Sequence, residues 1–104
     1  MIIEIVRFKH KDGVTRQEVV EGAETVVGHW QANPELIRKH FLVSEDNREG
    51  LGIYVWPSRE AAQKAHNSEW IARKKKDSAD GEISITYYDF FLEIDNERGM
   101  VRRF

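Results

Sequence analysis

Residues 83–94 read ISITYYDFFLEI, a run in which most positions carry β-branched, aromatic or aliphatic side chains. Such residues favour pleated, buried surfaces, so the run predicts one long closing strand. Successive side chains of a strand point to opposite faces of its sheet. Both faces are apolar here, with Ile83, Ile85 and Tyr87 on one side and Tyr88, Phe90 and Leu92 on the other. A sheet that contains this strand needs a cover on each face.

The first part of the chain predicts a strand, a helix and a second strand. Ile2–Lys9 is rich in β-branched residues and ends at a polar turn. Thr15, with Glu18 three residues later, fits a capping box that starts a helix reaching about Ala32. Apolar residues recur every three or four positions along this helix, which indicates one buried stripe. An Asn-Pro pair ends it, and a second strand is expected over 36–44.

The next part predicts a hairpin and a divided helix. The polar run 45–50 is typical of a hairpin loop, and the third strand follows it over 51–56. Ser58 is expected to cap the second helix. A polar break at 67–69 divides that helix, and Ser68 is expected to cap its second part.

The resulting order, βαββαβ, is the split βαβ arrangement of ferredoxin-like folds. The sequence therefore predicts an α+β domain over residues 1–95, with a four-stranded antiparallel sheet and both helices on one face. A second subunit is expected to cover the other apolar face, which gives a homodimer. The alternative is a monomer with a few exposed aromatic side chains. Residues 96–104 are predicted to form a polar, mobile tail.

Composition narrows the functional classes. With 104 residues, 40 % hydrophobic and 33 % charged, the chain is one ordinary globular domain. A net charge of -2 gives no basic surface for nucleic acid. The chain has no cysteine and no metal-binding histidine spacing, so no metal site is predicted. No signal peptide or run of about 20 apolar residues is present, so a cytoplasmic location without membrane contact is expected.

Three stretches resemble the dimeric α/β-barrel superfamily, and most closely its antibiotic-biosynthesis-monooxygenase type. They are the first strand, Ile2 to Phe8, the stretch from Pro34 to Phe41, and Gly52–Ala62, which reads GIYVWPSREAA. The third is the strongest, because a Gly-x-Tyr-x-aromatic strand enters a Ser-capped, Ala-rich helix. The stretch Asn67–Trp70 also fits. They are distributed between residues 2 and 70, so the resemblance spans most of the predicted domain of residues 1–95.

The resemblance implies a pocket in each subunit, between the helices and the sheet. Members of this superfamily oxidise phenolic polyketides with oxygen and no metal or flavin, break open haem, isomerise lactones, or only bind small molecules. The haem-degrading branch has an Asn near the end of its first strand and a His late in its second helix. This chain has Arg7 and Lys75 there. Protonated lysine is a poor iron ligand, so haem degradation is disfavoured unless another histidine has taken that role.

Three residues are candidates for catalysis. Arg7 is a permanent cation in an apolar strand and would hold an anionic oxygen of the substrate. The alternative for Arg7 is an ion pair with a glutamate, or a strand-end position that reaches water. His40 or His66 would remove a proton, because a free imidazole titrates near pH 6.5, at about the right place for a general base. The alternative for each is a packed histidine with one satisfied hydrogen bond.

Trp30, Tyr54 and Trp70 are candidates for binding a flat substrate, and the alternative for each is ordinary core. The leading functional prediction is a cofactor-independent monooxygenase that acts on a small aromatic or polycyclic compound. The alternatives are a non-catalytic small-molecule-binding or stress-associated protein, and an isomerase or lyase on the same fold.

Two further groups are expected to have structural roles only. The run Lys74–Lys76 is predicted to be a solvated helix end, where cations suit the helix dipole. Gly50–Gly52 contains no phosphate-binding pattern and is predicted to serve the hairpin.

Overall fold

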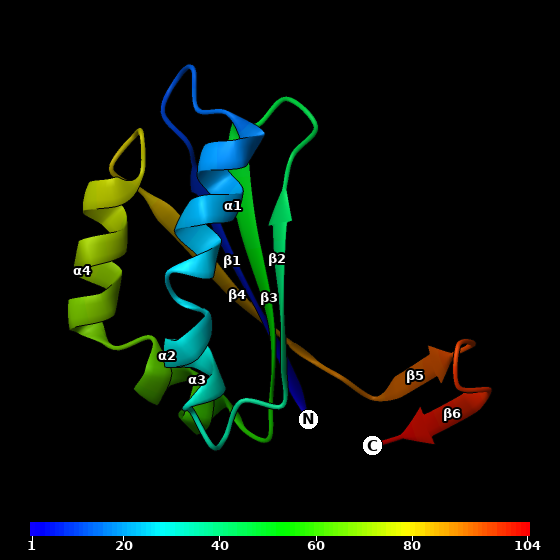
Figure 1. Cartoon of the computed structure of the whole chain (residues 1–104). Coiled ribbons are helices and arrows are strands. Elements are labelled where there is room, and N and C mark those ends of the chain that lie inside the picture. The colour runs from blue at the N-terminus through cyan, green and yellow to red at the C-terminus, as the bar shows by residue number, and fades with distance from the viewer.

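The computed structural model describes all 104 residues and contains a four-stranded sheet with helices on one side (Figure 1). The strand order is β2-β3-β1-β4. The two central strands are β3 (Glu49–Trp56) and β1 (Ile2–Lys9), and the edges are β2 (Arg38–Val43) and β4 (Ile83–Asp89). Every neighbouring pair is antiparallel. The predicted α+β, ferredoxin-like fold is confirmed.

The register decides which side chains share a face of the sheet. Glu4 of β1 lies opposite Tyr54 of β3 and opposite Tyr87 of β4. Directly paired residues of neighbouring strands project to the same face, so these three side chains lie together on the helix-covered face. The neighbours of Glu4 in β1, Ile3 and Ile5, point the other way.

The first helix, α1 (Arg16–Glu24), begins at the predicted capping box. The amide of Glu18 donates to the Thr15 hydroxyl at 3.2 Å, and the amide of Thr15 donates to the Glu18 carboxylate at 3.2 Å. These two bonds satisfy backbone donors that the first turn of a helix leaves free.

The prediction of one helix through to Ala32 is wrong. The helix stops after Glu24 and resumes as α2 (Val27–Gln31). At the break, the Thr25 hydroxyl donates to the carbonyl of Gly22 at 2.6 Å. Glycine and β-branched residues are weak helix formers, and they are concentrated in this stretch of the sequence.

The second helical region divides where the sequence predicts. α3 (Arg59–Ala65) begins at Ser58, whose hydroxyl accepts a backbone N–H at 3.1 Å. α4 (Ser68–Asp77) is capped by Asn67, whose side-chain oxygen accepts a backbone N–H at 2.9 Å, so the expectation of Ser68 as the cap is wrong. An Asn side chain reaches the free amides of the first turn as well as a Ser hydroxyl does. None of the helices is long and apolar enough to cross a membrane.

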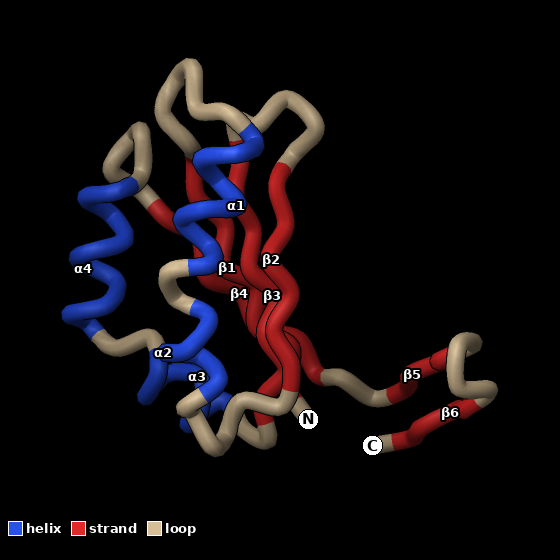
Figure 2. Tube along the Cα trace, in the orientation of Figure 1, coloured by secondary structure: helices blue, strands red, loops and turns tan.

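The helices pack on one face of the sheet, with α1 and α4 running along it and α2 and α3 toward one end (Figure 2). The other side is called the open face here, and its side chains include Ile3, Ile5, Arg7, His40, Ile53 and Tyr88. The core lies under the helices and consists of Val6, Trp30, Tyr54, Trp56, Ala61 and Ala62.

The closing strand is interrupted, so the prediction of one strand over 83–94 is wrong. β4 ends at Asp89, which lies opposite Ile2 at the start of β1. The amide of Phe90 donates to the carbonyl of Met1 at 2.9 Å, and β1 supplies no partner after that. A strand without a neighbour leaves its backbone groups unpaired, so the chain leaves the sheet at this point.

The chain then forms a hairpin that stands away from the sheet (Figure 1). β5 (Leu92–Asp95) pairs antiparallel with β6 (Met100–Arg103). Gly99, just before β6, has a φ of 62°, a left-handed conformation that suits glycine. The predicted mobile tail is therefore wrong for β6, which supplies the ladder partner that β5 needs.

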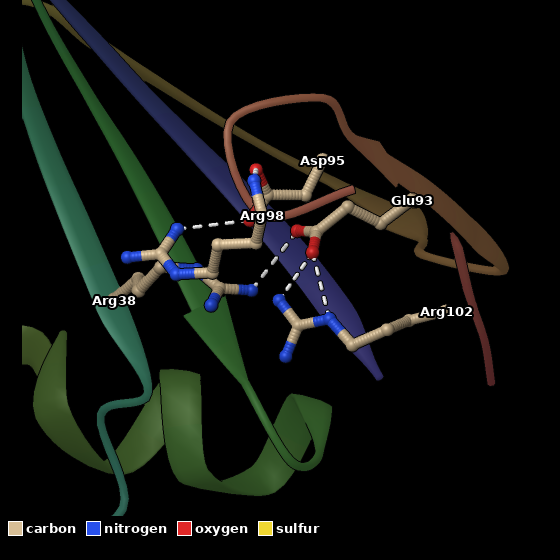
Figure 3. A network of polar contacts seen from close by, with 5 residues as sticks. All are labelled: Arg38, Glu93, Asp95, Arg98 and Arg102. Carbon is tan, nitrogen blue, oxygen red and sulfur yellow. Dashed lines mark hydrogen bonds and ion pairs between the residues drawn. The ribbon is translucent and has the colours of Figure 1, made fainter. Parts of the chain in front are cut away.

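An ion-pair network ties the hairpin to the edge of the sheet (Figure 3). Glu93 of β5 accepts a hydrogen bond from Arg38 of β2 at 3.1 Å. Its other oxygen accepts from the Arg102 Nε at 2.8 Å and from the Nη2 of the same guanidinium. Asp95 and Arg98 form a second pair, at 2.9 Å, inside the hairpin. The carboxylate of Glu93 therefore holds two guanidinium groups from different elements together.

Replacing this carboxylate should loosen the hairpin. In Glu93→Gln we expect the backbone amides of β5 and β6 to exchange with deuterium about tenfold faster, because three charge-assisted hydrogen bonds are weakened. Amides of β1 and β3 should keep their wild-type rates. Glu97→Gln, at an exposed position of the hairpin turn, is the matched control. Unchanged exchange in Glu93→Gln would mean that the network does not hold the hairpin.

Candidate functional site

A partly open cavity of about 790 Å³ lies between α1, α4 and the helix-covered face of the sheet. Its size is in the range of small-molecule pockets, and its position is the one that the resemblance implies. Aromatic side chains from both layers line it, together with several basic ones. The aromatic group is Phe8, Trp30, Phe41, Tyr54 and Trp70, and the lysines and arginines are Arg16, Lys39, Arg73 and Lys74.

Two glycines of β3 make room for the cavity. A β-carbon on Gly52 would lie 2.8 Å from Cε1 of Tyr54, and one on Gly50 would overlap the ring of Phe8. The aromatic rings therefore occupy space that any larger residue would fill. Both glycines lie in the β2–β3 hairpin, as expected, and both also line the cavity.

The amine of Lys39 is held among aromatic rings at the cavity wall. Its Nζ donates to the hydroxyl of Tyr54 at 2.8 Å. It also lies 4.0 Å from the ring centre of Phe41, 4.3 Å from that of Trp30 and 4.4 Å from that of Tyr54. Cation–π attraction favours this placement of an ammonium group. No carboxylate lies within ion-pairing distance of it.

This environment changes the acidity of the lysine. Burial and, to a smaller extent, the nearby ammonium of Lys74 lower the pKa of Lys39 from its ordinary range to about 7, against the opposing effect of the Glu4 carboxylate. Aromatic faces and one hydroxyl replace water poorly as a solvent for a positive charge. Lys39 therefore exchanges its proton near neutral pH, which is the range in which a general base works best.

Lys74 also belongs to the cavity. Its Nζ lies 3.6 Å from the ring centre of Phe8, and it is half-buried. Burial lowers the pKa of Lys74, and the carboxylate of Asp77 opposes that shift. The prediction of a solvated helix end is therefore wrong for Lys74, although it is correct for the exposed Lys75 and Lys76.

Tyr54 connects Lys39 to the interior. Its side chain is almost completely buried, and its ring lies 5.1 Å from the ring of Trp30, centre to centre. Burial, together with the negative charge of Glu4, raises the pKa of Tyr54 above its ordinary range. The phenol therefore keeps its proton at neutral pH and is available as a hydrogen-bond donor.

A buried carboxylate lies behind the aromatic wall. Glu4 has no exposed surface, its Oε1 accepts a hydrogen bond from the indole of Trp56 at 2.9 Å, and the same oxygen lies 2.7 Å from Nδ1 of His66. The His66 contact is short but is not aligned as a hydrogen bond, and Nε2 of His66 has no partner. Buried carboxylates require partners of this kind. The three side chains thus join β1, β3 and the residue that ends α3.

The structure brings several predicted site residues together. His66 is buried, and its ring centre lies 4.2 Å from that of Trp70, 4.6 Å from that of Tyr54 and 5.2 Å from that of Trp30. The three aromatic residues line the cavity, and His66 packs directly behind them.

Arg7 and His40 lie elsewhere. Both project from the open face and neither lines the cavity. Arg7 forms an ion pair with Glu49 at 2.7 Å, which is the structural alternative considered for it. His40 is exposed and lies opposite Ile53 of β3.

Sequence reasoning missed Glu4 and Lys39. Lys39 immediately precedes His40, so a strand that turns His40 outward must turn Lys39 inward. The strand pairing would have identified Lys39 as a site residue, since Lys39 lies opposite Tyr54. Glu4 has the same signal, because it also pairs with Tyr54, across the next ladder.

No family model and no curated protein sequence matches this chain. Solved structures do match it. A protein described as an antibiotic biosynthesis monooxygenase superposes with a TM-score of 0.68 at 15% identity, over 86% of this chain and 98% of the other. At this identity the match shows a shared fold, and the resemblance predicted from the sequence is confirmed at that level.

Two matching structures contain ligands. The monooxygenase ActVA-Orf6 of Streptomyces coelicolor, solved with nanaomycin D, has a TM-score of 0.66 at 17% identity, over 89% of both chains. A mutant of MhuD, solved with two manganese protoporphyrin IX molecules per active site, has a TM-score of 0.67 at 17% identity, over 91% of this chain and 99% of the other. These two proteins, which share the fold, thus bind small ligands.

Removing the Lys39 amine should stabilise the protein at low pH. A lysine with a lowered pKa in the folded state opposes folding fully below pH 7, and the penalty disappears as pH rises from about 7 toward about 10.5. Lys39→Met should therefore raise the free energy of unfolding by about 1–2 kcal/mol at pH 6, allowing for partial exposure, and by much less at pH 9.

Urea unfolding at both pH values measures this difference. Lys75→Met, at an exposed position of α4, is the matched control and should change the stability little at either pH. A Lys39→Met effect that does not depend on pH would show that the amine is not desolvated.

Proposed function

We propose that the cavity binds a flat aromatic compound with an acidic hydroxyl or enol group and that the protein oxidises it with molecular oxygen. The observation that carries this proposal is the amine of Lys39, which faces the cavity among aromatic rings without a carboxylate partner. The matching monooxygenase structures support it as a chemistry that this fold accommodates.

Lys39 acts as the base in this proposal. Above about pH 7 its neutral amine takes a proton from the bound phenol or enol. The resulting ammonium then faces the organic anion, and their attraction is strengthened by the low polarity of the aromatic wall. The hydroxyl of Tyr54, 2.8 Å from Nζ, orients the amine.

Deprotonation matters because an electron-rich anion can pass an electron to oxygen without a cofactor. For an anthrone, the methylene carbon loses two hydrogen atoms and gains one oxygen atom as a carbonyl. The second oxygen atom leaves as water, so the substrate supplies all the electrons that oxygen needs. The protein contributes binding, orientation and proton removal.

The predicted site residues take different parts in this scheme. Trp30, Tyr54 and Trp70 form the wall against which the flat substrate stacks. His66 is a positioning residue, since its ring supports that wall from behind. Arg7 and His40 project from the open face and take no part in the proton transfer.

We also propose that two copies of the chain form a homodimer through their open faces. Half-buried apolar side chains such as Ile5 and Ile53 lie there without a helix to cover them. Tyr88 is 58% exposed on the same face. Contiguous apolar surface of this kind marks an interaction site.

Oxygen consumption tests the enzymatic proposal. With anthrone as substrate, wild-type protein should consume oxygen at a rate that increases with pH through about 7, as Lys39 loses its proton. Lys39→Met should reduce the rate by about 10²-fold or more. Lys75→Met should keep the wild-type rate.

Equal rates in wild type and Lys39→Met would remove Lys39 from the mechanism. Quenching of tryptophan fluorescence by anthrone without oxygen uptake would favour the alternative of a binding protein that has no turnover.

Light scattering at micromolar concentration tests the homodimer. The mass should be twice the 12.2 kDa of one chain. Ile53→Glu should give the mass of a single chain, because it places a charge in the middle of the open face. Ala72→Glu, at an exposed position of α4, should stay dimeric. A single-chain mass for the wild type would contradict the proposed dimer.

A further inference from the structure

We propose that Lys39 is also a nucleophile, and that its amine captures aldehydes and ketones as a Schiff base inside the cavity. This inference goes beyond the proposed oxygenation and does not depend on it, because imine formation uses no oxygen. The cavity that is proposed above to bind flat aromatic molecules would then also bind carbonyl compounds covalently.

The geometry of Lys39 suits a nucleophile. The amine lies at the cavity wall, and its one hydrogen bond is to the neutral hydroxyl of Tyr54 at 2.8 Å. The rings of Trp30, Phe41 and Tyr54, at 4.0 to 4.4 Å, take the place of part of the water around it. A lysine desolvated in an apolar pocket close to a second cation is the usual setting of an imine-forming amine.

Other lysines of the chain lack one or more of these features. Lys9 and Lys64 face carboxylates of Asp80 and Glu35 at 3.7 Å and are largely exposed. Lys74 shares the cavity, but its ammonium lies over the ring of Phe8 without a hydroxyl beside it.

Lys39 also differs from the exposed lysines in the fraction of its amine that is neutral. Only a neutral amine has the lone pair that attacks a carbonyl carbon. Because burial brings the pKa of Lys39 to about 7, half or more of its amines are neutral at pH 7.5. An exposed lysine, with a pKa of about 10.4, is neutral in roughly one molecule in a thousand at that pH.

The reaction needs no further reagent. The lone pair of Nζ forms a bond to the carbonyl carbon, the carbon–oxygen π bond opens, and a proton passes from the nitrogen to the oxygen to give a carbinolamine. The carbon–oxygen bond then breaks, the oxygen leaves as water with the second proton of the nitrogen, and a neutral imine remains. One amine and one carbonyl thus give one imine and one water. Tyr54 stays protonated and donates a hydrogen bond to the oxygen as it accumulates charge.

The cavity selects the class of carbonyl compound. Its volume of about 790 Å³ accepts a bicyclic or tricyclic body. The faces of Trp30 and Trp70 favour a flat aromatic body over a polar one. We therefore assign aryl aldehydes and aryl ketones as the ligand class, with the carbonyl carbon directed at Nζ.

Reductive trapping tests the inference. Wild-type protein is incubated with 2-naphthaldehyde and sodium cyanoborohydride, which reduces imines in preference to aldehydes. Intact mass should show one main adduct, equal to the aldehyde less one oxygen atom, and peptide mapping should place it on Lys39. The trapping rate should increase with pH up to about 7 and then level off, apart from the intrinsic pH dependence of the reducing agent, which a free amine of known pKa calibrates.

Variants separate this role from others. Lys39→Met should lose the main adduct, and Lys75→Met should retain it. Tyr54→Phe should keep the adduct on Lys39 but form it several-fold more slowly. Because wild-type peptide mapping alone identifies the modified residue, the test does not depend on whether a variant folds.

Adducts spread over the exposed lysines, or no adduct on Lys39, would overturn the inference. Oxygen uptake with anthrone in the absence of a Lys39 adduct would overturn the nucleophilic role and leave the oxygenation proposal intact. A Lys39 adduct without oxygen uptake would support the nucleophilic role and count against the oxygenase.

Discussion

The site depends on a carboxylate that has no contact with water. Glu4 lies in the central strand β1, and its oxygen is shared between the indole of Trp56 and the ring of His66. These contacts fix a neighbouring strand and the end of α3 to the middle of the sheet. His66 in turn packs against Tyr54 and Trp70, which form part of the cavity wall. Loss of the indole of Trp56 would remove the hydrogen bond that this buried carboxylate accepts, which is strongly unfavourable.

The wall that this arrangement supports determines the chemistry of Lys39. Rings replace water on several sides of its amine, and the only hydrogen bond is to a hydroxyl. Glu4 is near enough to attract the ammonium, but burial and the charge of Lys74 outweigh that attraction. The amine of Lys39 thus has a pKa in the neutral range, and it faces an open cavity with a flat apolar wall. Proton removal from a phenol and addition to a carbonyl both require that combination.

Local patterns in the sequence were sufficient for the fold. The capping box at Thr15, the cap at Ser58 and the segments rich in β-branched and aromatic residues predict the order of elements. Two predictions, the single strand over 83–94 and the mobile tail, are wrong for the same reason, because both segments depend on tertiary partners. β5, the strand after β4, needs β6 as its partner. The apolar run 83–94 does not show how far the neighbouring strand extends beside it. The site was harder to predict from the sequence. The lowered pKa of Lys39 comes only from residues that the register of the strands places around it. Tyr54 and Trp70 were found as aromatics, but the groups with unusual chemistry are ordinary charged residues in the sequence.

The acidity of Lys39 in the folded protein tests the central claim most directly. Lysine labelled with ¹⁵N at Nζ, followed by NMR through a pH titration and assigned with Lys39→Met, reports the protonation of each amine. The structure predicts that one lysine resonance titrates at about pH 7 and disappears in that variant. A Lys39 resonance that titrates with the exposed lysines, near pH 10.5, would contradict the claim that the aromatic wall holds a reactive amine.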